Sequence, residues 1–513
     1  MSETKDYRVL LINPPYERLR GLSAESYPLG LGYLATMLHN RGFYSRIYNA
    51  ELLNEDINSA YTNLGRMKSQ DLFEQALSDD NHPVWQEIRR FIISFQPDVV
   101  GITALSTTYS SSLKVARIVK SINPNVKILF GGVHPNICFD QVIPEPDIDY
   151  IILGEGEYSV VELIEALYQK KIDLSLIDGL AWKSESNVIV NNKRARIDDL
   201  DSLPFVNREL MINWQKLSLH SLSTMIASRG CPYHCTFCSN VSLWGRKVKY
   251  RSVANIIEEL MLLREKYHIH SFSFWDDTFT SNKALTKELC NALVSDKLNK
   301  NLIWECYTRV NVIDEELLHV LKNAGCYAVY VGVESGSQRI LNIIKKQITK
   351  EQVRSAAKLI KDIGLYFGTF FMVGNPYETE DDIKQTISFI EELDPDYVNL
   401  CTFMPYPGTE LFDQTVDLGL FDKDINWKDL TKYSQHSEHN YFAVNISKDR
   451  YNVLVSQLAS TINDVTSKPS KGKRNKFIKR MIYLVPYSFM NPVVALRKIR
   501  TKFLNKIYSL KES

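Results

Sequence analysis

The chain has 513 residues, of which 44% are hydrophobic and 24% charged, which excludes a disordered or fibrous protein and suggests about three folded domains. Eight cysteines in so long a chain exclude a disulfide framework, and the first residues lack a secretory signal, so we expect a cytoplasmic protein. The net charge of +1 hides an asymmetry, because residues 468–513 carry thirteen Lys or Arg and one acid, which leaves 48 basic and 59 acidic residues before them.

The first 170 residues alternate short apolar runs with segments of helical spacing. Helical spacing is found at 29–38 and 111–121. The apolar runs that read as buried strands are 7–13, 43–48, 98–103, 127–132 and 150–155. This alternation predicts an α/β domain over residues 1–170, built on a doubly wound, Rossmann-like parallel sheet.

Small and polar residues follow these predicted strands, where open α/β sheets bind their ligands. Taken alone, each is typical of a tight turn, but together they would let a large ligand lie against the backbone. The candidates are Asn13, Thr103, Ser106, Gly131, Gly132, Gly154 and Glu155. We interpret His134, the one histidine among these segments, as a polar loop residue, and His82 as part of a surface loop.

Residues 171–220 read as a linker with short β segments, and a strand-like segment at 223–230 leads into three cysteines. Cys231, Cys235 and Cys238 form a C-x-x-x-C-x-x-C pattern. Three thiolates can bind three corners of a cubane cluster and leave one iron open, whereas structural clusters usually have four protein ligands. The alternative is a zinc site with His234 or a distant fourth ligand, although zinc sites usually show two separated ligand pairs.

Strands and helices alternate again after the cysteines and predict a partial β/α barrel over residues 221–412, followed by a helical region at 413–467. The predicted helices are 254–267, 282–298, 314–324, 350–363 and 380–393. The predicted strands are 270–275, 302–308, 328–334, 367–374 and 397–403. In such a barrel the functional loops follow the strand ends.

The cysteine pattern, with its Cys-Pro-Tyr opening and Phe-Cys ending, resembles the signature of radical S-adenosylmethionine enzymes. The segments 28–35 and 131–135 ahead of it resemble the cobalamin-binding domain of the cobalamin-dependent branch of that family. The resemblance covers residues 7–412 and implies three cofactors: a [4Fe-4S] cluster on Cys231, Cys235 and Cys238, S-adenosylmethionine and cobalamin. The D-x-H-x-x-G motif is absent, so we expect no cobalt-binding histidine from it.

The barrel strand ends carry further candidates for holding S-adenosylmethionine. Asp276 and Asp277 could receive its ammonium group, or cap the next helix. Glu334 and Ser335 look like the family's ribose-contacting strand, and Gly374 lies in a motif that resembles the family's adenine-side segment.

The resemblance implies a radical enzyme that methylates an unactivated carbon, with one S-adenosylmethionine methylating cobalamin and a second supplying the radical. An oxidative cyclase or rearranging enzyme without methyl transfer stays open, as does a non-catalytic cobalamin or cluster-binding sensor. A methylthiotransferase is disfavoured, because the N-terminal domain offers only Cys138 for a second cluster. The implied partners are a small-molecule or lipid substrate and a low-potential electron donor of the flavodoxin or ferredoxin type.

The basic tail at residues 468–513 mixes Lys and Arg with apolar side chains. Pro486 and Pro492 interrupt its apolar stretch, which makes it a poor transmembrane helix. Its amphipathic character suits peripheral contact with an anionic membrane, and a helical extension packed on the barrel is the alternative. Nucleic acid is a weaker option, because no RNA-binding module accompanies the charge.

Overall fold

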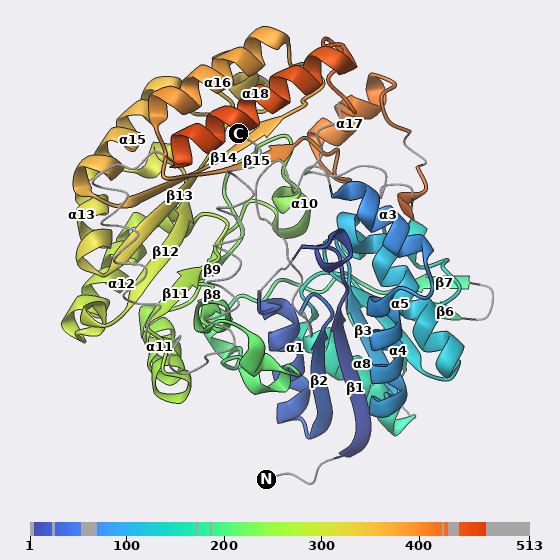
Figure 1. Ribbon diagram of the computed structural model, residues 1–513. Coiled ribbons are helices and arrows are strands. Elements are labelled where there is room, and N and C mark those ends of the chain that lie inside the picture. The colour runs from blue at the N-terminus through green and yellow to red at the C-terminus, as the bar shows by residue number, and fades with distance from the viewer. Residues whose placement is uncertain are drawn as a thin grey trace. The chain divides into compact units, whose positions relative to one another are not determined.

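The computed structural model describes residues 5–22, 26–52, 69–170, 173–184, 187–422, 425–428 and 441–467. The basic tail at 468–513 lies outside the described residues. The chain divides into two compact units: the first contains residues 1–59, 71–217 and 424–432, and the second contains 60–70, 218–423 and 433–513. Figure 1 shows the elements of both units.

The described part of the first unit is built on a seven-stranded sheet in the order β2-β1-β3-β4-β5-β6-β7. The strands from β2 to β5 pair in parallel, whereas β6 and β7 join the edge in antiparallel pairs. Their bounds are β1 Lys5–Asn13, β2 Phe43–Asn49, β3 Val99–Thr103, β4 Lys127–Gly131, β5 Tyr150–Ile152, β6 Leu180–Ser184 and β7 Asn187–Val190. The strand order reverses between β1 and β3, which is where ligands bind in doubly wound sheets.

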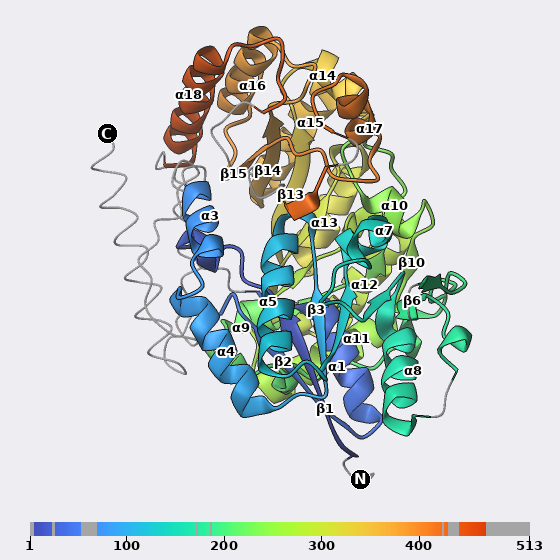
Figure 2. The ribbon, with the colours of Figure 1, turned by 90° about the vertical axis from the view of Figure 1, so that its right-hand side faces the viewer.

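Helices cover both faces of this sheet. Figure 2 shows α4 and α5 on one face and α1 and α8 on the other, and α1 packs against α8 as α4 does against α5. The bounds are α1 Leu29–Asn40, α3 Gln70–Ser78, α4 Pro83–Phe95, α5 Tyr109–Ile122, α6 Val133–Ile137, α7 Phe139–Val142 and α8 Gly156–Gln169. Because both faces are covered, residues 9–12 of β1, 99–102 of β3 and 128–130 of β4 are buried and carry no charged side chain, as expected for parallel strands covered on both faces.

The second unit contains a six-stranded parallel sheet in the order β15-β14-β13-β12-β11-β8, again counting the described residues. The bounds are β8 Thr224–Met225, β11 Ser271–Phe274, β12 Ile303–Thr308, β13 Cys326–Glu334, β14 Tyr366–Val373 and β15 Tyr397–Thr402. A short antiparallel pair, β9 Ser228–Arg229 and β10 Lys249–Tyr250, stands beside it. The sheet curves with its helices outside, as in a partial barrel (Figure 1).

The helices of the second unit begin at recognisable caps. Ser252, Asp314, Thr349 and Thr379 each accept a hydrogen bond from the first turn of the helix that follows. The bounds are α9 Leu219–Leu222, α10 Asn240–Trp244, α11 Val253–Tyr267, α12 Lys283–Ser295, α13 Glu315–Asn323, α14 Gln338–Ile343, α15 Lys350–Ile363, α16 Glu380–Leu393, α17 Glu410–Asp417 and α18 Lys448–Ser467.

The predicted fold class is confirmed: a doubly wound parallel sheet precedes a partial β/α barrel. The strands and helices predicted in both halves are present, with ends that differ by a few residues. Within the described residues, no helix has the length and apolar character needed to cross a membrane.

Candidate active site

The three cysteines lie in one loop between β9 and α10, and each is partly exposed. The backbone turns tightly between two of them, since Cys238 N donates to Cys235 O at 3.1 Å. Cys231 Sγ lies 3.5 Å from Thr278 Oγ1. Burial raises the pKa of the Cys238 thiol to about 11.

Backbone hydrogen bonds on both sides of Thr236 fix the middle of this loop. Thr236 N donates to Ile344 O at 3.0 Å, and Thr236 O accepts from Leu411 N at 2.8 Å. Thr236 is also 2% exposed. The cysteine loop is therefore anchored by the end of α14 and the start of α17.

The two aspartates after β11 have different surroundings. Asp276 is buried and accepts hydrogen bonds from Ala227 N at 3.0 Å and from the Ser228 hydroxyl, and burial raises its pKa to about 6. Asp277 is exposed. Asp276 thus holds the segment that leads into the cysteine loop, and Asp277 is the carboxylate of the pair that faces solvent.

Glu334 ends β13 and forms a nearly buried ion pair with Lys346, whose Nζ lies 2.6 Å from Glu334 Oε1. Its backbone is left-handed, with φ of 72°. A Cβ on Gly332 would stand 2.7 Å from Lys346 Nζ, so the glycine leaves the space that the pair occupies. Glu334 is therefore held at the strand end by a cation that the sequence analysis did not identify.

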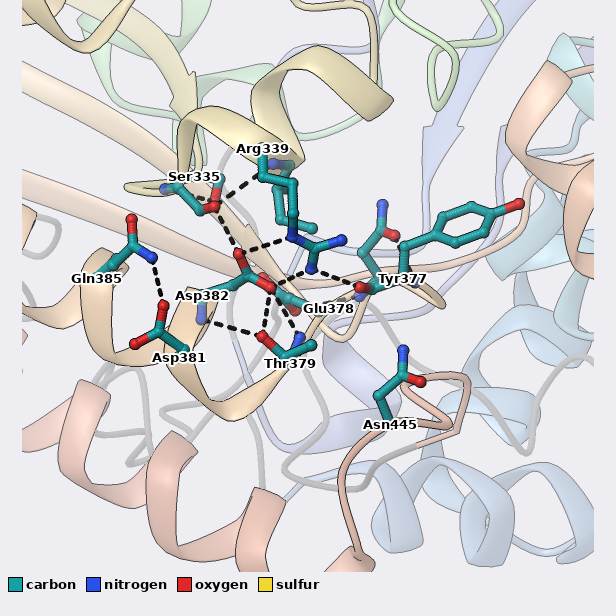
Figure 3. Close-up of polar contacts among 12 residues, drawn as sticks. Ser335, Arg339, Tyr377, Glu378, Thr379, Asp381, Asp382, Gln385 and Asn445 are labelled. Atoms are coloured by element: carbon teal, nitrogen blue, oxygen red, sulfur yellow. Dashed lines mark hydrogen bonds and ion pairs between the residues drawn. The ribbon is translucent and has the colours of Figure 1, made fainter.

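A polar network joins the loop after β13 to the start of α16 (Figure 3). Ser335 is fully buried, and its Oγ accepts from Ser337 N at 3.1 Å. The carboxylate of Asp382 in α16 accepts hydrogen bonds from Ser337 Oγ at 2.5 Å and from Thr379 N at 2.9 Å, and it forms an ion pair with the Arg339 guanidinium. Burial alone would raise the pKa of Asp382, but these hydrogen bonds outweigh it and lower that pKa.

The loop after β14 is shaped by an internal carboxyl group. Gly374, with φ of 88°, donates its N–H to Glu378 Oε2 at 2.6 Å, and Asn375 N donates to the same oxygen at 3.3 Å. Glu378 is fully buried, which raises its pKa to about 8. Its other oxygen, Oε1, has no hydrogen-bond partner among the described residues.

Hydrogen bonds bring together the candidate residues that follow β3 and β4 in the first unit. Ala104 N donates to Gly131 O at 2.8 Å, and a Cβ on Gly132 would stand 2.9 Å from Thr103 Oγ1. In contrast, a Cβ on Gly131 would meet nothing within 4 Å. This edge of the sheet, at the carboxyl ends of its parallel strands, is called the rim below. It contains one closely packed glycine, Gly132, and one glycine with free space beside it, Gly131.

The interpretation of His134 as a polar loop residue is wrong. It lies in α6 with no exposed surface, and its Nδ1 is 3.1 Å from Ser106 Oγ. The rings of Tyr109 and Trp427 pack on it at centroid distances of 4.4 and 5.3 Å. Burial lowers the pKa of His134 to about 3, so the ring is neutral at physiological pH.

The other three candidates of the first unit lie at the ends of β1 and β5. Asn13 Nδ2 donates to Asn49 Oδ1 at 2.9 Å. Gly154 has φ of 86° and donates its N–H to Asn136, and a Cβ there would meet nothing within 4 Å. Glu155 is buried and accepts from Ile197 N at 2.7 Å, which ties the end of β5 to the segment before the barrel.

One polar cluster on the barrel sheet had no counterpart in the sequence analysis. Glu305 on β12 is buried and accepts from Ser273 Oγ at 3.2 Å and from the Tyr327 hydroxyl, and it lies 3.2 Å from His220 Nε2. The sequence does contain an indication of this cluster, because a carboxylate within the predicted strand at residues 302–308 needs polar partners if it is buried.

Comparison with known proteins gives two domain matches. Residues 225–390 match the model of the radical SAM superfamily, and residues 21–164 match the model of the B12 binding domain. An uncharacterised methyltransferase of Pyrococcus horikoshii is 33% identical over 431 residues, which cover 83% of this chain and 87% of the relative. The chain belongs to the cobalamin-dependent radical S-adenosylmethionine enzymes.

Other relatives of this enzyme differ in activity. An anaerobic magnesium-protoporphyrin IX monomethyl ester cyclase of Rubrivivax gelatinosus is 28% identical over 80% of the chain and 70% of the relative. The solved structure of the radical S-adenosylmethionine methyltransferase TsrM from Kitasatospora setae, with cobalamin and a [4Fe-4S] cluster bound, shares the fold, with a TM-score of 0.67. It covers 91% of this chain and 92% of its own at 16% identity.

The expected cofactors of the enzyme are confirmed at the level of the family: a [4Fe-4S] cluster, S-adenosylmethionine and cobalamin. The described residues fit them. Three partly exposed thiols stand in one loop, and the described residues contain no tight group of three His, Cys, Asp or Glu ligands for a single ion. In a cubane each thiolate binds its own iron, so no such group is needed.

Proposed function

We propose that this enzyme transfers a methyl group from S-adenosylmethionine to an unactivated carbon of a small molecule. The observation that carries the proposal is the presence in one chain of a three-thiol loop on the partial barrel and a glycine-containing rim on a doubly wound sheet. Methyltransferases among the relatives support it: the Pyrococcus horikoshii protein, and a cytidylyl-2-hydroxyethylphosphonate methyltransferase of Streptomyces wedmorensis at 26% identity.

In this proposal Cys231, Cys235 and Cys238 hold the cluster and leave one iron open. The cluster and cobalamin supply radical generation and methyl carriage, respectively, when they are bound. Asp277 is the exposed carboxylate that can take the ammonium of S-adenosylmethionine, while Asp276 keeps the cysteine loop in place. Glu334, fixed by Lys346, is positioned to accept hydrogen bonds from a ribose.

Ser335 and Gly374 contribute to the S-adenosylmethionine site through the backbone in this proposal. The Ser335 side chain is buried and bonded to its own turn, and Gly374 is bonded to Glu378. Both therefore shape the loops that would line the ribose and adenine, and neither needs a free side chain to do so.

Gly131 and Gly154 leave open space at the rim of the first unit, where a large flat ligand such as cobalamin can approach the backbone. Asn13, Thr103 and Ser106 supply polar atoms along the same sheet edge. Glu155 would act indirectly, since its carboxylate holds Ile197.

A cyclase is the second candidate, because the Rubrivivax gelatinosus cyclase matches most of the chain. We also propose a flavodoxin or ferredoxin as electron donor. We further propose that the substrate is a lipid and that the basic tail makes peripheral membrane contact. A hopanoid C-3 methylase among the relatives, at 23% identity over 65% of the chain, supports a lipid substrate.

S-adenosylhomocysteine formation separates the two activities. The anaerobically reconstituted enzyme, supplied with S-adenosylmethionine and reductant, is predicted to form S-adenosylhomocysteine only when cobalamin is added, because methyl donation by S-adenosylmethionine leaves that product. Formation of 5′-deoxyadenosine without any cobalamin-dependent S-adenosylhomocysteine would favour the cyclase.

The cysteine assignment has its own test. We predict that Cys235→Ala loses the cluster and all cleavage of S-adenosylmethionine, because two thiolates hold a cubane poorly. Cys138→Ala, which removes a buried thiol of the first unit, serves as the matched control and should retain both. Iron content and product analysis measure the effect, and full cleavage by Cys235→Ala would refute the assignment.

A further inference from the structure

Arg309 is a buried side chain of the barrel that contacts a cysteine of the loop. It follows β12, is 5% exposed, and directs Nη1 to Cys235 Sγ at 3.3 Å. An N–H donor at this distance from sulfur makes a hydrogen bond, and the bond is stronger when the sulfur is a thiolate.

The guanidinium is fixed from several sides, so its contact with the sulfur is imposed by the fold. Its plane lies over the Tyr233 ring, with Cζ 3.8 Å from the ring centroid. Nη2 donates to the Lys346 carbonyl, and Nε donates to Asn311 Oδ1 at 3.3 Å. Asn311 Nδ2 in turn donates to the Tyr233 hydroxyl at 3.4 Å, which completes a clamp of Arg309, Tyr233 and Asn311.

No carboxylate pairs with Arg309 within the part of the chain that the structure describes. The nearby Lys346 is also cationic, and its charge is already paired with Glu334. A buried guanidinium without a counter-charge is unfavourable, so an anion is needed beside it. The polar group it contacts in the cysteine loop is the sulfur of Cys235.

We propose that Arg309 is a positioning residue that provides the counter-charge for the cluster at Cys235 and raises the cluster's reduction potential. The inference rests on the proposed role of the cysteines as cluster ligands. The cluster gains one negative charge when it accepts an electron, so a fixed positive charge and a hydrogen bond to a ligand sulfur stabilise the reduced form more than the oxidised form. The electron comes from the low-potential donor, or from dithionite in the assay.

The test is a redox titration of the anaerobically reconstituted protein without S-adenosylmethionine. Arg309→Gln removes the charge and is expected to lower the equilibrium constant for reduction at least tenfold, which is about 59 mV for one electron. Arg309→Lys keeps the charge but loses the planar fork, so a smaller shift in the same direction is expected. Arg354→Gln, which removes an arginine paired with Glu392 on the barrel surface, should leave the potential unchanged.

Two results would overturn the proposal: equal potentials for Arg309→Gln and the unaltered protein, or a shift that appears only when S-adenosylmethionine is present. The second result would mean that the arginine acts on that molecule.

If Arg309→Gln folds by circular dichroism but binds no cluster, cluster binding by Arg309→Lys becomes the test. Retention of the cluster by Arg309→Lys supports the role of the charge, and equal loss in both variants contradicts it. If Arg309→Gln does not fold, the potential of Arg309→Lys is measured instead: a small shift to lower potential supports the proposal, and a potential equal to that of the unaltered protein would refute the hydrogen bond from the guanidinium to Cys235. Absence of a cluster from the unaltered protein would instead refute the proposed function.

Discussion

The ion pair between Glu334 and Lys346 shows how one residue position depends on its surroundings. Both side chains are nearly buried, and the pair stands where we propose that a ribose binds. Removing one partner of such a pair usually costs about 3–5 kcal/mol, because the other charge stays buried alone. The pair is therefore expected to matter for the stability of the barrel as well as for ligand binding.

Glu334→Ala should weaken S-adenosylmethionine binding at least tenfold and lower the free energy of unfolding, while the iron content stays unchanged. The neighbouring pair of Lys345 and Glu410 is half exposed, so Glu410→Ala is a matched control that should cost about 1 kcal/mol or less. Equilibrium binding and iron analysis measure the effects. Unchanged affinity in Glu334→Ala would return this residue to a purely structural role.

Glu378 gives the stability of the protein a pH dependence. Its pKa is raised from 4.5 to about 8 in the folded protein by burial, so the folded state retains a proton that the unfolded state loses near pH 4.5. The free energy of unfolding must then fall as pH rises from about 4.5 to 8, by about 1.4 kcal/mol for each pKa unit over which the two states differ.

Glu378→Gln keeps an acceptor for Gly374 N but cannot ionise, so its free energy of unfolding should fall less steeply over the same pH range. Chemical denaturation of both proteins at several pH values measures the difference. Glu51 and Asp276, whose pKa values burial raises to about 7 and 6, give both proteins a residual slope in the same direction. Parallel curves for the two proteins would show that Glu378 ionises normally.

Helices α15 and α16 begin in the same way but have different surroundings. Thr349 and Gln352 form a capping box at α15, and Thr379 and Asp382 form one at α16. Asp382 also binds Ser337 and Arg339, so the side chains of the second box are connected to the segment that follows Glu334 (Figure 3).

Replacing either threonine by alanine should lower the free energy of unfolding by about 1 kcal/mol, the usual cost of losing an N-cap. Thr379→Ala should in addition weaken S-adenosylmethionine binding, whereas Thr349→Ala should leave it intact. Denaturation and binding measurements on the two variants check this. Equal affinities would mean that the network around Asp382 does not reach the ligand.

Elements with a complete local pattern could be predicted from the sequence, and contacts between distant residues could not. The helix at 350–363 has a cap, regular spacing and a terminal glycine, and it was predicted at its observed bounds. Lys346 could not be found in this way, because its approach to Glu334 depends on a turn in which Lys345 and Gln347 have left-handed backbones. Likewise, His134 is buried by Trp427, nearly three hundred residues later in the chain.

Helices α4 and α8 were also not predicted, although they complete the two faces of the first sheet. The segment before α4 was interpreted as a surface loop, yet His82 Nδ1 accepts from Val84 N at 3.4 Å and caps this helix. Gly154 and Glu155, predicted as ligand-binding residues, directly precede the helix that starts at Gly156. A segment that both lies at the ligand-binding edge of a sheet and begins a helix does not have the sequence pattern of a helix alone.

The uneven charge distribution along the chain leads to a prediction for the basic tail. Lys and Arg attract an anionic membrane surface by about 1 kcal/mol each, and residues 468–513 carry thirteen of them. A protein ending at Thr466 should therefore sediment far less with anionic vesicles than the full chain. Neutral vesicles serve as the control, and unchanged sedimentation would separate the tail from membrane binding.

The proposed methyl transfer requires cobalamin in the first unit and a cluster in the second. The most direct test is to reconstitute the protein anaerobically with iron, sulfide and cobalamin, pass it through a gel-filtration column, and read the bound cobalamin from the absorption spectrum. We predict about one cobalamin per chain with the cluster present. An intact cluster without retained cobalamin would contradict the proposed methyl transfer and leave cobalamin-independent radical chemistry.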